Sequence, residues 1–366
     1  MQSAIPCSLM RGGTSKGLFF MADQLPQEIA LRDSTLLAAM GSPDERQING
    51  VGGAHPLTSK VAIVKPSTHP DADVDYLFLQ VSVDQALVSD TQNCGNMLAA
   101  VGPFAIEQGV IKATENETFV RIHMINTGGI AIAKIQTPNG QVQYGGVAKI
   151  DGVPGNSAPV FLEFLNIAGS SCGQLLPTGK TVNTIDGIEV TCIDNGMPVV
   201  LIRAQDLGKT GYETPQELEK DEQLKQRIET IRLQLGELMN LGDVSKKTVP
   251  KVSLIAAARN GGALCTRTFI PHRVHEAIGV LGAASVATAC ILPGTVAQSL
   301  VTTNYENTLH LLDVEHPTGS FSVEIELDNN TALPDINRIA LLRTARLLMR
   351  GEVLIPGTTD QNLSRD

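Results

Sequence analysis

The sequence predicts an α+β protein of two similar halves, each with strands wrapped around a central helix. Its 366 residues are more than one hydrophobic core usually serves. Many short β-rich runs are broken by Gly, Pro, Asn and Asp. Two small-residue apolar segments, 94–109 and 275–292, are alike, and each follows a polar stretch. We therefore expect one domain in residues 1–182 and a second in 183–355.

The strands of the first half alternate with turn-rich segments. The runs expected as strands cover 59–65, 75–83, 119–127, 130–138 and 141–150. Asn139-Gly140 stands between the last two of these runs, and this dipeptide predicts a hairpin that joins them. Further strands are expected at 158–165, 188–194, 197–204, 251–258 and 321–327.

Three helices are expected. The first begins near Cys94, and Pro103 should bend or interrupt it. The second runs from Pro215 to about Met239, because Thr214 and Glu217 form a capping-box pattern before an apolar face at helical spacing. Its charged face is expected to be solvated. The third covers 275–292 and must be buried on all sides, because it has no polar face.

Composition excludes several classes of protein. The net charge is −10 and no basic block occurs, which argues against a nucleic-acid partner. No apolar run reaches the roughly 18 residues of a membrane span, and the first 17 residues do not resemble a secretion signal, so we expect a cytoplasmic protein. The six cysteines are scattered, which indicates free thiols. We expect no metal, because His272 and His275 are near each other but lack partners at ligand spacing.

Two segments before residue 65 carry groups with possible chemistry. "MRGGTSKG" (10–17) combines glycines that allow close backbone approach with donors from Arg11, Thr14, Ser15 and Lys16. This segment can hold an anion, or it can be a tight turn with exposed side chains. It lacks the GxxxxGK[ST] spacing of the Walker phosphate-binding loop. Lys60 opens a β-run, where a lysine is either a solvated edge residue or, inside a closed cleft, a base available near neutral pH.

Cys94 lies in "NCGNM" (93–97), at the predicted start of a helix. The positive end of the helix dipole would stabilise a thiolate there, and the exposed N–H groups could bind a carboxylate. The alternative is a buried inert cysteine, but the polar neighbours Asn93, Gly95 and Asn96 favour a reactive one.

A fourth segment, "CTRTFIPHRVHEAIGVLGAA" (265–284), carries a weaker pattern. Arg267 could pair with a carboxylate through its planar guanidinium, and His272 and His275 could titrate near neutral pH. Each of these groups could equally be an ordinary surface residue or a satisfied buried one.

Taken in order, these segments resemble one known family. "MRGGTSKG", "GGAHPLTSKVAI", "NCGNM", "IDGVPG", "EVTCIDNGMPVV", "NLGDVS" and "FIPHRVHEAIGV" are similar to the PrpF family of isomerases, named for 2-methylaconitate cis-trans isomerase. The resemblance extends from Ile5 to Gly351. Stretches at 46–63, 73–81 and 258–290 are most similar to the members that tautomerise 4-oxalomesaconate in gallate catabolism.

The resemblance implies the diaminopimelate-epimerase-like fold, with two pseudo-symmetric domains, each a β-barrel-like sheet around a central helix, and the site in the cleft between them. It implies that Lys60 and Cys94 are an acid/base pair. It also implies that the Gly-rich segment and the helix starts hold substrate carboxylates. The residues expected to bind substrate are therefore Arg11, Thr14, Ser15, Lys16, Gly95, Asn96, Met97, Arg267 and Gly282.

One departure from the epimerases bears on mechanism. They have a cysteine at the start of both central helices, whereas here the second helix is expected to begin at Gly279 to Gly282, with Leu281 near the thiol position. One thiol and one lysine suit proton movement along an allylic system better than racemisation by two thiols.

The predicted function is therefore a cofactor-independent tautomerase acting on a small unsaturated tricarboxylate, 4-oxalomesaconate. Backbone N–H groups and Arg267 would stabilise the developing enolate. The nearer alternative is isomerisation of 2-methylaconitate or aconitate by the same groups. The more distant one is a carboxylate-binding protein without catalysis. The family likeness also makes a homodimer plausible.

Overall fold

The computed structural model describes residues 2–90, 93–165, 167–245, 247–270, 273–301, 308–328 and 335–357. Two compact units divide the chain, Met1–Glu163 with Arg343–Asp366 and Phe164–Leu342. The sequence places the boundary at 182/183 and gives the second domain everything up to 355. The division differs because the long last strand leaves the second unit and returns to pair with the first strand of the chain.

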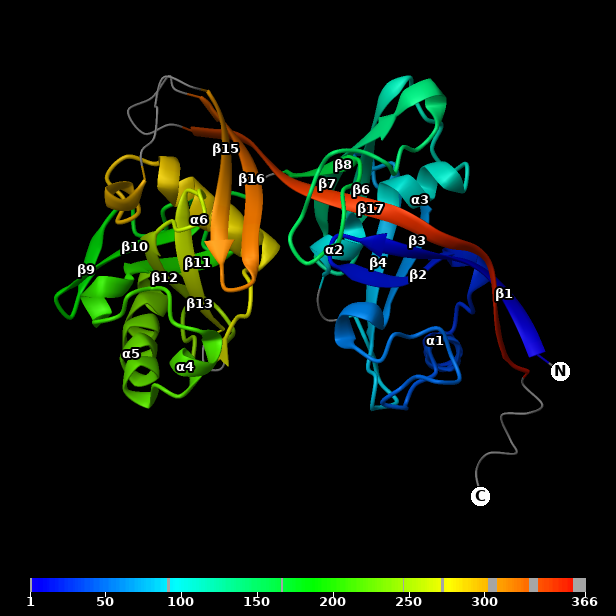
Figure 1. Cartoon of the computed structure of the whole chain (residues 1–366), viewed down its shortest axis with the longest axis horizontal. Helices are drawn as coiled ribbons and strands as arrows, with labels where there is room; N and C mark the ends of the chain where they lie inside the picture. Colours follow the sequence, from blue (N-terminus) through cyan, green and yellow to red (C-terminus); the bar gives the residue numbers. More distant parts are fainter. Residues whose placement is uncertain are drawn as a thin grey trace. The chain divides into compact units, whose positions relative to one another are not determined.

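The first unit contains most of β1–β8 and three α-helices (Figure 1). Its strands are β1 (Gln2–Gly12), β2 (Ser15–Met21), β3 (Lys60–Pro66), β4 (Val74–Val81), β5 (Val88–Ser89), β6 (Asn116–Met124), β7 (Gly129–Thr137) and β8 (Pro159–Phe164). Its helices are α1 (Ile29–Met40), α2 (Gly95–Leu98) and α3 (Val101–Glu107), with 3₁₀ turns η1 (Ala22–Gln24), η2 (Pro56–Thr58) and η3 (Pro138–Gly140).

The second unit has the same kinds of element. Its strands are β9 (Asn183–Ile185), β10 (Ile188–Asp194), β11 (Pro198–Arg203), β12 (Lys251–Ala257), β13 (Leu264–Ile270), β14 (Arg273–Val274), β15 (Leu309–His316) and β16 (Gly319–Asp328). Its helices are α4 (Pro215–Glu219), α5 (Glu222–Leu238) and α6 (Val280–Ile291), with η4 (Ala204–Leu207) and η5 (Gln298–Leu300). Strand β17 (Asp335–Pro356) pairs with β16 in its first part and with β1 in its second.

The strand order confirms the expected repeat. In the first unit β1–β2 is antiparallel, β2–β3 parallel, β3–β4 antiparallel, β4–β6 parallel and β6–β7 antiparallel. The same sequence of pairings runs through β10, β11, β12, β13, β15 and β16. Helices occupy the parallel crossovers in both units, as such connections require. The chain therefore folds as two copies of one topology.

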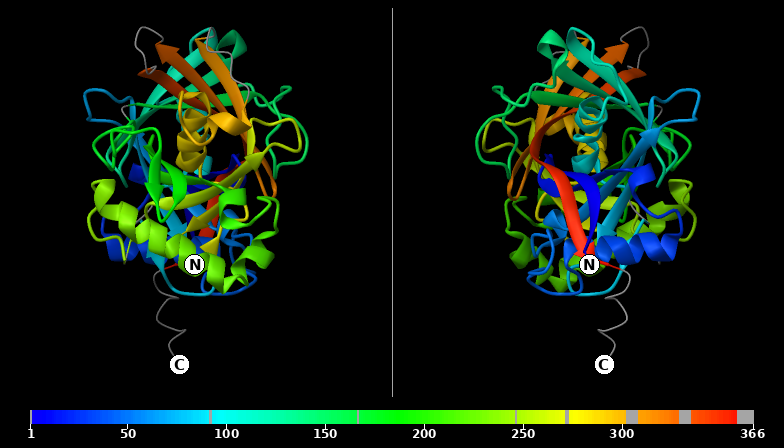
Figure 2. Two further views of the ribbon diagram at one scale, coloured as in Figure 1. Left: turned by 90° about the vertical axis from the view of Figure 1, so that its left-hand side faces the viewer. Right: turned by 90° about the vertical axis from the view of Figure 1, so that its right-hand side faces the viewer.

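Each unit has a central helix and an outer helix. In the first unit α2 packs on β1 and β2, and α3 packs on β3, β6 and β7. In the second, α6 packs on β10, β11, β15 and β16 and is buried from Gly282 to Ile291. Figure 2 shows both central helices enclosed by strands. The outer helices α1 and α5 cover the other face of the sheets through apolar clusters that include Leu36 and Ile228.

Two predicted helices contain breaks. The helix expected from Cys94 is divided at Ala99–Ala100, so that Pro103 falls in the first turn of α3, where a missing N–H costs little. The interruption predicted from Pro103 is confirmed. The capping box of Thr214 and Glu217 is also present. The single helix expected over 215–239 is wrong, because α4 ends at Glu219 and Asp221 caps a new helix.

The hairpin expected at Asn139-Gly140 is wrong in its second strand. The dipeptide does turn, with φ of 56° at Asn139 and 71° at Gly140, as a type I′ turn requires. Gln143 N–H donates to the Gln136 carbonyl at 2.9 Å. Beyond that bond the run 141–150 forms no strand with β7. The hairpin partner of β7 is instead β6, through the turn at 125–128.

Candidate active site

The glycines of "MRGGTSKG" form the turn from β1 to β2, and this turn packs on the start of α2. A Cβ atom at Gly12 would lie 2.3 Å from the Asn96 carbonyl oxygen, and one at Gly13 would lie 2.2 Å from Asn96 Oδ1. Gly13 also has φ of +52°. The close approach predicted from the glycines is therefore made by the chain itself, which locks the turn to α2.

Arg11 builds this turn. Its Nη1 donates to the Gly13 carbonyl at 2.9 Å and to the carbonyl and hydroxyl oxygens of Thr344 at 3.1 and 2.9 Å. Its Nη2 donates to Ser157 Oγ at 3.2 Å. Burial, and then the charge of Arg346, lower the pKa of Arg11. The guanidinium expected to meet a substrate carboxylate instead holds the turn against β17.

The other polar residues of the turn differ in what they contact. Thr14 Oγ1 accepts a hydrogen bond from Asn96 Nδ2 at 3.0 Å, a second tie between the turn and α2. Ser15 is 1% exposed, and its Oγ has no hydrogen-bond partner among the described residues. Lys16 extends toward the 53–58 loop, with Nζ 3.5 Å from the Cβ position of Gly53. The turn thus presents a buried hydroxyl and an amine.

Cys94 is the N-cap residue of α2, as predicted, with φ −132° and ψ 99°. Its N–H donates to Asn93 Oδ1 at 2.8 Å, and its carbonyl accepts from Leu98 N–H at 3.0 Å. The cysteine is partly exposed, whereas the other five are buried, and none of the six forms a disulfide. Burial raises the pKa of both Cys192 and Cys290 to about 12, which keeps these thiols inert.

Two buried side chains respond to charge on the Cys94 thiolate. Burial raises the pKa of Tyr76 well above its usual value, and the thiolate charge raises it further. Burial lowers the pKa of Arg343 to about 9, and the thiolate charge acts in the opposite direction. Arg343 is still a cation at neutral pH, so a buried positive charge acts on Cys94. Nothing in the sequence near Cys94 indicated this residue, which comes from β17.

Lys60 is buried, with 6% exposure, at the first position of β3. Its Nζ donates to Gln80 Oε1 at 2.7 Å and lies 4.9 Å from the centroid of the Phe78 ring. Gln80 stands directly opposite Lys60 in the β3–β4 ladder. Lys60 is therefore a buried, hydrogen-bonded residue and not a solvated edge residue.

Strand β4 contacts both the Lys60 side chain and the backbone of Cys94. Side chains two apart on a strand share a face, so Tyr76, Phe78 and Gln80 of β4 line up. Lys60 contacts this row at Phe78 and Gln80, and the Tyr76 hydroxyl donates to the Cys94 carbonyl at 3.3 Å.

Gly17 of β2 joins the same group from the other side. It pairs with Lys60 in the parallel β2–β3 ladder. A Cβ atom at Gly17 would lie 2.2 Å from the Lys60 carbonyl oxygen and 2.7 Å from Met97 Cε. The Lys60 backbone and the Met97 side chain of α2 therefore both approach Gly17.

The remaining predicted residues belong to the second unit. Arg267 of β13 is 7% exposed; its Nε donates to the Glu213 carbonyl at 2.5 Å, and its Nη1 donates to the Thr266 carbonyl at 2.8 Å. Gly282 is in α6, where an added Cβ would meet Ile278 at 3.6 Å. Leu281 follows the N-cap Gly279, within the predicted helix start. Burial, and then the Lys251 charge, lower the pKa of His275, while His272 lies outside the described residues.

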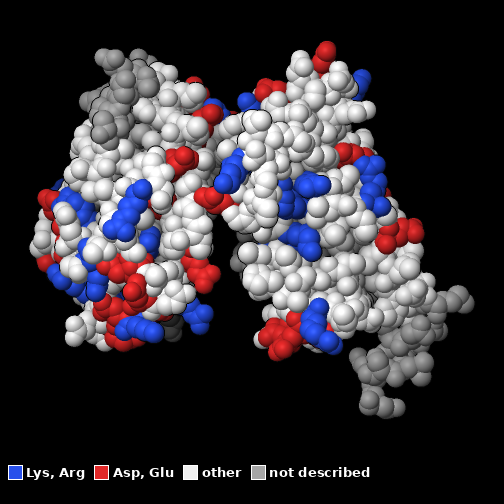
Figure 3. Space-filling view, viewed as in Figure 1, with Lys and Arg blue, Asp and Glu red and all other residues white. Residues whose placement is uncertain are grey.

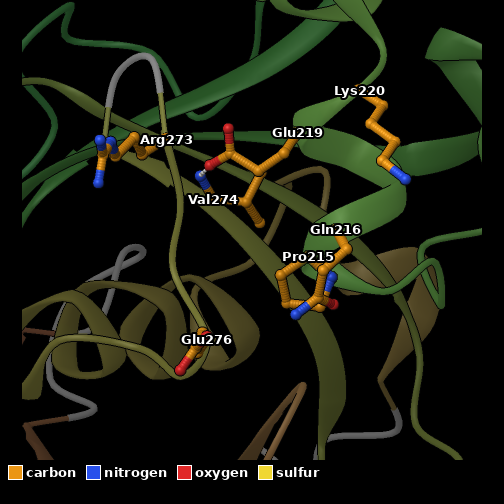
Figure 4. Close-up of a pocket in the computed structure, with 7 residues that line it drawn as sticks. All are labelled: Pro215, Gln216, Glu219, Lys220, Arg273, Val274 and Glu276. Atoms are coloured by element: carbon orange, nitrogen blue, oxygen red, sulfur yellow. Dashed lines mark hydrogen bonds between the residues drawn. The ribbon is translucent and has the colours of Figure 1, made fainter.

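A hollow of about 520 Å³ opens in the second unit between α4 and β14 (Figure 4). It is lined by Pro215, Gln216, Glu219, Lys220, Arg273, Val274 and Glu276. Glu219 Oε1 accepts from the Val274 N–H at 2.6 Å. None of the predicted site residues lines this hollow, and its acidic and basic side chains are mixed.

Two features of the described residues bear on other functions. No three His, Cys, Asp or Glu side chains in this part of the chain are grouped to hold a metal ion. None of the described helices combines the length and the apolar character needed to cross a membrane. On the face seen in Figure 3 both units carry basic and acidic side chains.

Comparison with known proteins was made at the level of family, sequence and structure. The family described as PrpF protein matches residues 2–356. A 4-oxalomesaconate tautomerase from Pseudomonas putida is 58% identical over 354 residues, 97% of each chain. A (4E)-oxalomesaconate Delta-isomerase from Novosphingobium sp. is 57% identical over 355 residues, 97% of this chain and 98% of its own.

Solved structures agree with the fold. A methylitaconate-delta-isomerase superposes with a TM-score of 0.85 at 35% identity, covering 97% of this chain and 96% of its own. A hydroxyproline epimerase from Agrobacterium vitis superposes with a TM-score of 0.52 at 16% identity, covering 97% and 94%. The second likeness concerns the fold alone, and it confirms the expected epimerase-like architecture of two related halves.

Proposed function

The chain belongs to the PrpF family, and on this basis we propose that it is a cofactor-independent isomerase that tautomerises 4-oxalomesaconate. The observation that carries the proposal is that the buried Lys60 amine contacts Phe78 and Gln80 of β4, the strand whose Tyr76 hydroxyl donates to the Cys94 carbonyl. A buried amine and a partly exposed thiol near a buried cation are the groups that proton transfer at carbon needs. The two relatives named for oxalomesaconate favour this substrate.

In the proposed reaction one of the two groups removes a proton from a carbon next to a carbonyl. The electron pair left behind delocalises into the conjugated system as an enolate, and the other group returns a proton at the far end. No net charge or electron is gained or lost. Each positioned acid or base contributes typically about 10² to 10⁴ in rate. N–H groups of Gly95, Asn96 and Met97 at the start of α2 would stabilise the enolate.

The substrate carboxylates are assigned to the β1–β2 turn and the start of α2. Lys16 supplies a cation, and Ser15 supplies a buried hydroxyl with no other partner. Arg11 acts through the turn that it holds. We retain Arg267 and Gly282 as the second unit's contribution, with Arg267 acting through the backbone carbonyls that it binds.

The test is an assay of the purified protein by ultraviolet absorbance with 4-oxalomesaconate, 2-methylaconitate and aconitate. Cys94→Ser and Lys60→Met should each lower kcat by about 10² to 10⁴, because each removes one proton-transfer group. Cys7→Ser and Lys65→Met are the matched controls: Cys7 is a buried cysteine of the same unit, and Lys65 is a lysine of β3 paired with Asp75. Full activity of either site variant would remove that residue from the scheme.

The alternatives predict different outcomes of the same assay. A 2-methylaconitate or aconitate isomerase would turn over those acids faster than 4-oxalomesaconate; the likeness to a methylitaconate isomerase keeps this alternative open. A carboxylate-binding protein would bind one of the acids saturably but would incorporate no deuterium from heavy water into it.

Three further assignments belong to the proposal. The family resemblance supports a role in gallate breakdown, and cysteines without disulfides suit the reducing cytoplasm. A homodimer is supported by exposed apolar side chains on β17, where Leu348, Met349 and Leu354 are 45%, 41% and 56% exposed. Analytical ultracentrifugation of the purified protein and fractionation of cells test the last two directly.

A further inference from the structure

Gln80 holds the Lys60 amine in a defined direction. The Nζ–Oε1 distance is 2.7 Å, and the two residues are direct partners across β3 and β4. The other end of the Gln80 amide donates to the carbonyls of Ser59 at 2.9 Å and Pro56 at 3.1 Å. A flipped amide would place its NH₂ against the ammonium and its oxygen against two carbonyl oxygens. The hydrogen-bond network therefore fixes the amide oxygen toward Lys60.

The partner of this buried lysine is unusual in carrying no charge. Buried lysines are normally paired with carboxylates. Here the neighbours of Lys60 are Gly17 in the β2 ladder and Phe78 and Gln80 from β4. Among the described residues, the Lys60 amine forms its hydrogen bond with the Gln80 amide and its ring contact with Phe78, and neither partner is a carboxylate.

A neutral partner has two consequences for proton transfer to a polyanionic substrate. An amide oxygen orients the ammonium without the added stabilisation that a carboxylate would give to the protonated form. It also adds no negative charge next to a substrate that carries several, which a carboxylate at this position would repel.

We propose that Gln80 is the positioning residue that aims the Lys60 amine at the substrate without placing a negative charge next to that amine. The inference rests on the proposed function, since it assigns a role within that reaction. Gln80 acts through Lys60 and is not itself an acid or base.

Two variants of Gln80 test the inference. Gln80→Met keeps the length of the side chain and removes both of its hydrogen-bonding ends, so kcat should fall by about 10- to 100-fold, the cost of a misplacement of roughly 1 Å, with KM changed less than threefold. Gln80→Glu keeps an acceptor and adds charge. It should move the pH limb that reports loss of the amine's proton to higher pH and raise KM at least threefold. Gln136→Met is the matched control, because that strand glutamine bonds to Glu117.

The outcomes separate the two proposals. If the wild type turns over the acids but Gln80→Met retains full kcat and Gln80→Glu has an unmoved pH profile, the role of Gln80 is refuted and the proposed function stands. If the wild type turns over none of the acids, the proposed function fails, and the role of Gln80 fails with it. Should Gln80→Met not fold by circular dichroism, Gln80→Glu decides through its pH limb, which a purely structural role would leave in place.

Discussion

Replacing Gly17 by alanine should displace Lys60 while leaving the side chains of both proposed catalytic residues, Lys60 and Cys94, chemically unchanged. Gly17 lies in β2, beside Lys60 in the parallel ladder. The added Cβ would lie 2.2 Å from the Lys60 carbonyl oxygen, 2.7 Å from its carbonyl carbon and 2.7 Å from Met97 Cε. The Met97 methyl group can rotate away, but the backbone of Lys60 cannot, so β2 and β3 must separate.

The size of the separation follows from the contact. Real Cβ atoms essentially never approach another heavy atom closer than 3.0 Å, so the 2.2 Å contact requires a shift of at least about 0.8 Å, the difference between these distances. A misplacement of about 1 Å at a catalytic group lowers a rate by about 10²-fold. Overpacking of this kind also costs about 1–3 kcal/mol of stability.

The assay is steady-state kinetics on 4-oxalomesaconate together with urea unfolding. We expect kcat of Gly17→Ala to fall about 100-fold while the protein remains folded. Gly351→Ala is the control, because this glycine of β17 has open space around its Cβ position. It should keep kcat within a factor of two. Unchanged kcat in a folded Gly17→Ala would show that contact between the strands does not set the position of Lys60, and the geometric argument for the site would fail.

Three other perturbations test the surroundings of the site and the fold. Arg343→Met should slow alkylation of Cys94 by iodoacetamide at pH 8 by about 3- to 30-fold, since loss of a nearby cation disfavours the thiolate; an equal rate would contradict the assigned role of that charge. Arg232→Met should lower the free energy of unfolding in urea by about 3 kcal/mol, since Arg232 is fully buried and donates to two backbone carbonyls; a loss below about 1 kcal/mol would refute this. Burial tends to raise the pKa of Glu315, but hydrogen bonds from three backbone N–H groups outweigh it and lower the pKa overall. Its stabilisation is therefore present above the unfolded pKa of about 4.3 and is lost as pH falls through the folded pKa. Glu315→Gln should cost about 1–3 kcal/mol at pH 7 and progressively less on the acid side, whereas a cost independent of pH would contradict the assignment.

Features encoded locally were predictable from the sequence. The start of α2 at Cys94, the capping box of Thr214 and the burial of α6 each depend on residues within a few positions of one another. The close approach at the Gly-rich turn was also predicted, although the group that approaches the glycines is Asn96 of the same chain. Family resemblance added the pairing of Lys60 with Cys94, which no local pattern contains.

Features that depend on distant strands were missed. Gln80 appeared as one polar residue in a β-run, and its role arises because β4 lies antiparallel to β3. Arg343 reaches the surroundings of Cys94 because β17 returns to pair with β1. The charged face of the 215–239 helix was expected to be solvated, yet Arg232 is buried and donates to the carbonyls of Val244 and Val249. Its bonds to Glu229 complete the pairing that a buried guanidinium requires.

The repeated topology makes the difference between the two units informative. Lys251 opens β12 as Lys60 opens β3, each after a parallel crossover. Burial, and then the charge of Arg232, lower the pKa of Lys251 to about 8, so this amine of the second unit loses its proton more readily than an exposed lysine does. The helices differ: α2 is capped by Cys94, whereas α6 is capped by Gly279. Both units therefore place a lysine at the same position of one topology, but the residues that cap their central helices differ. Different groups suit a reaction whose two proton-transfer steps occur at different carbons. Identical groups would be needed only for a reaction that inverts a single carbon centre from both sides.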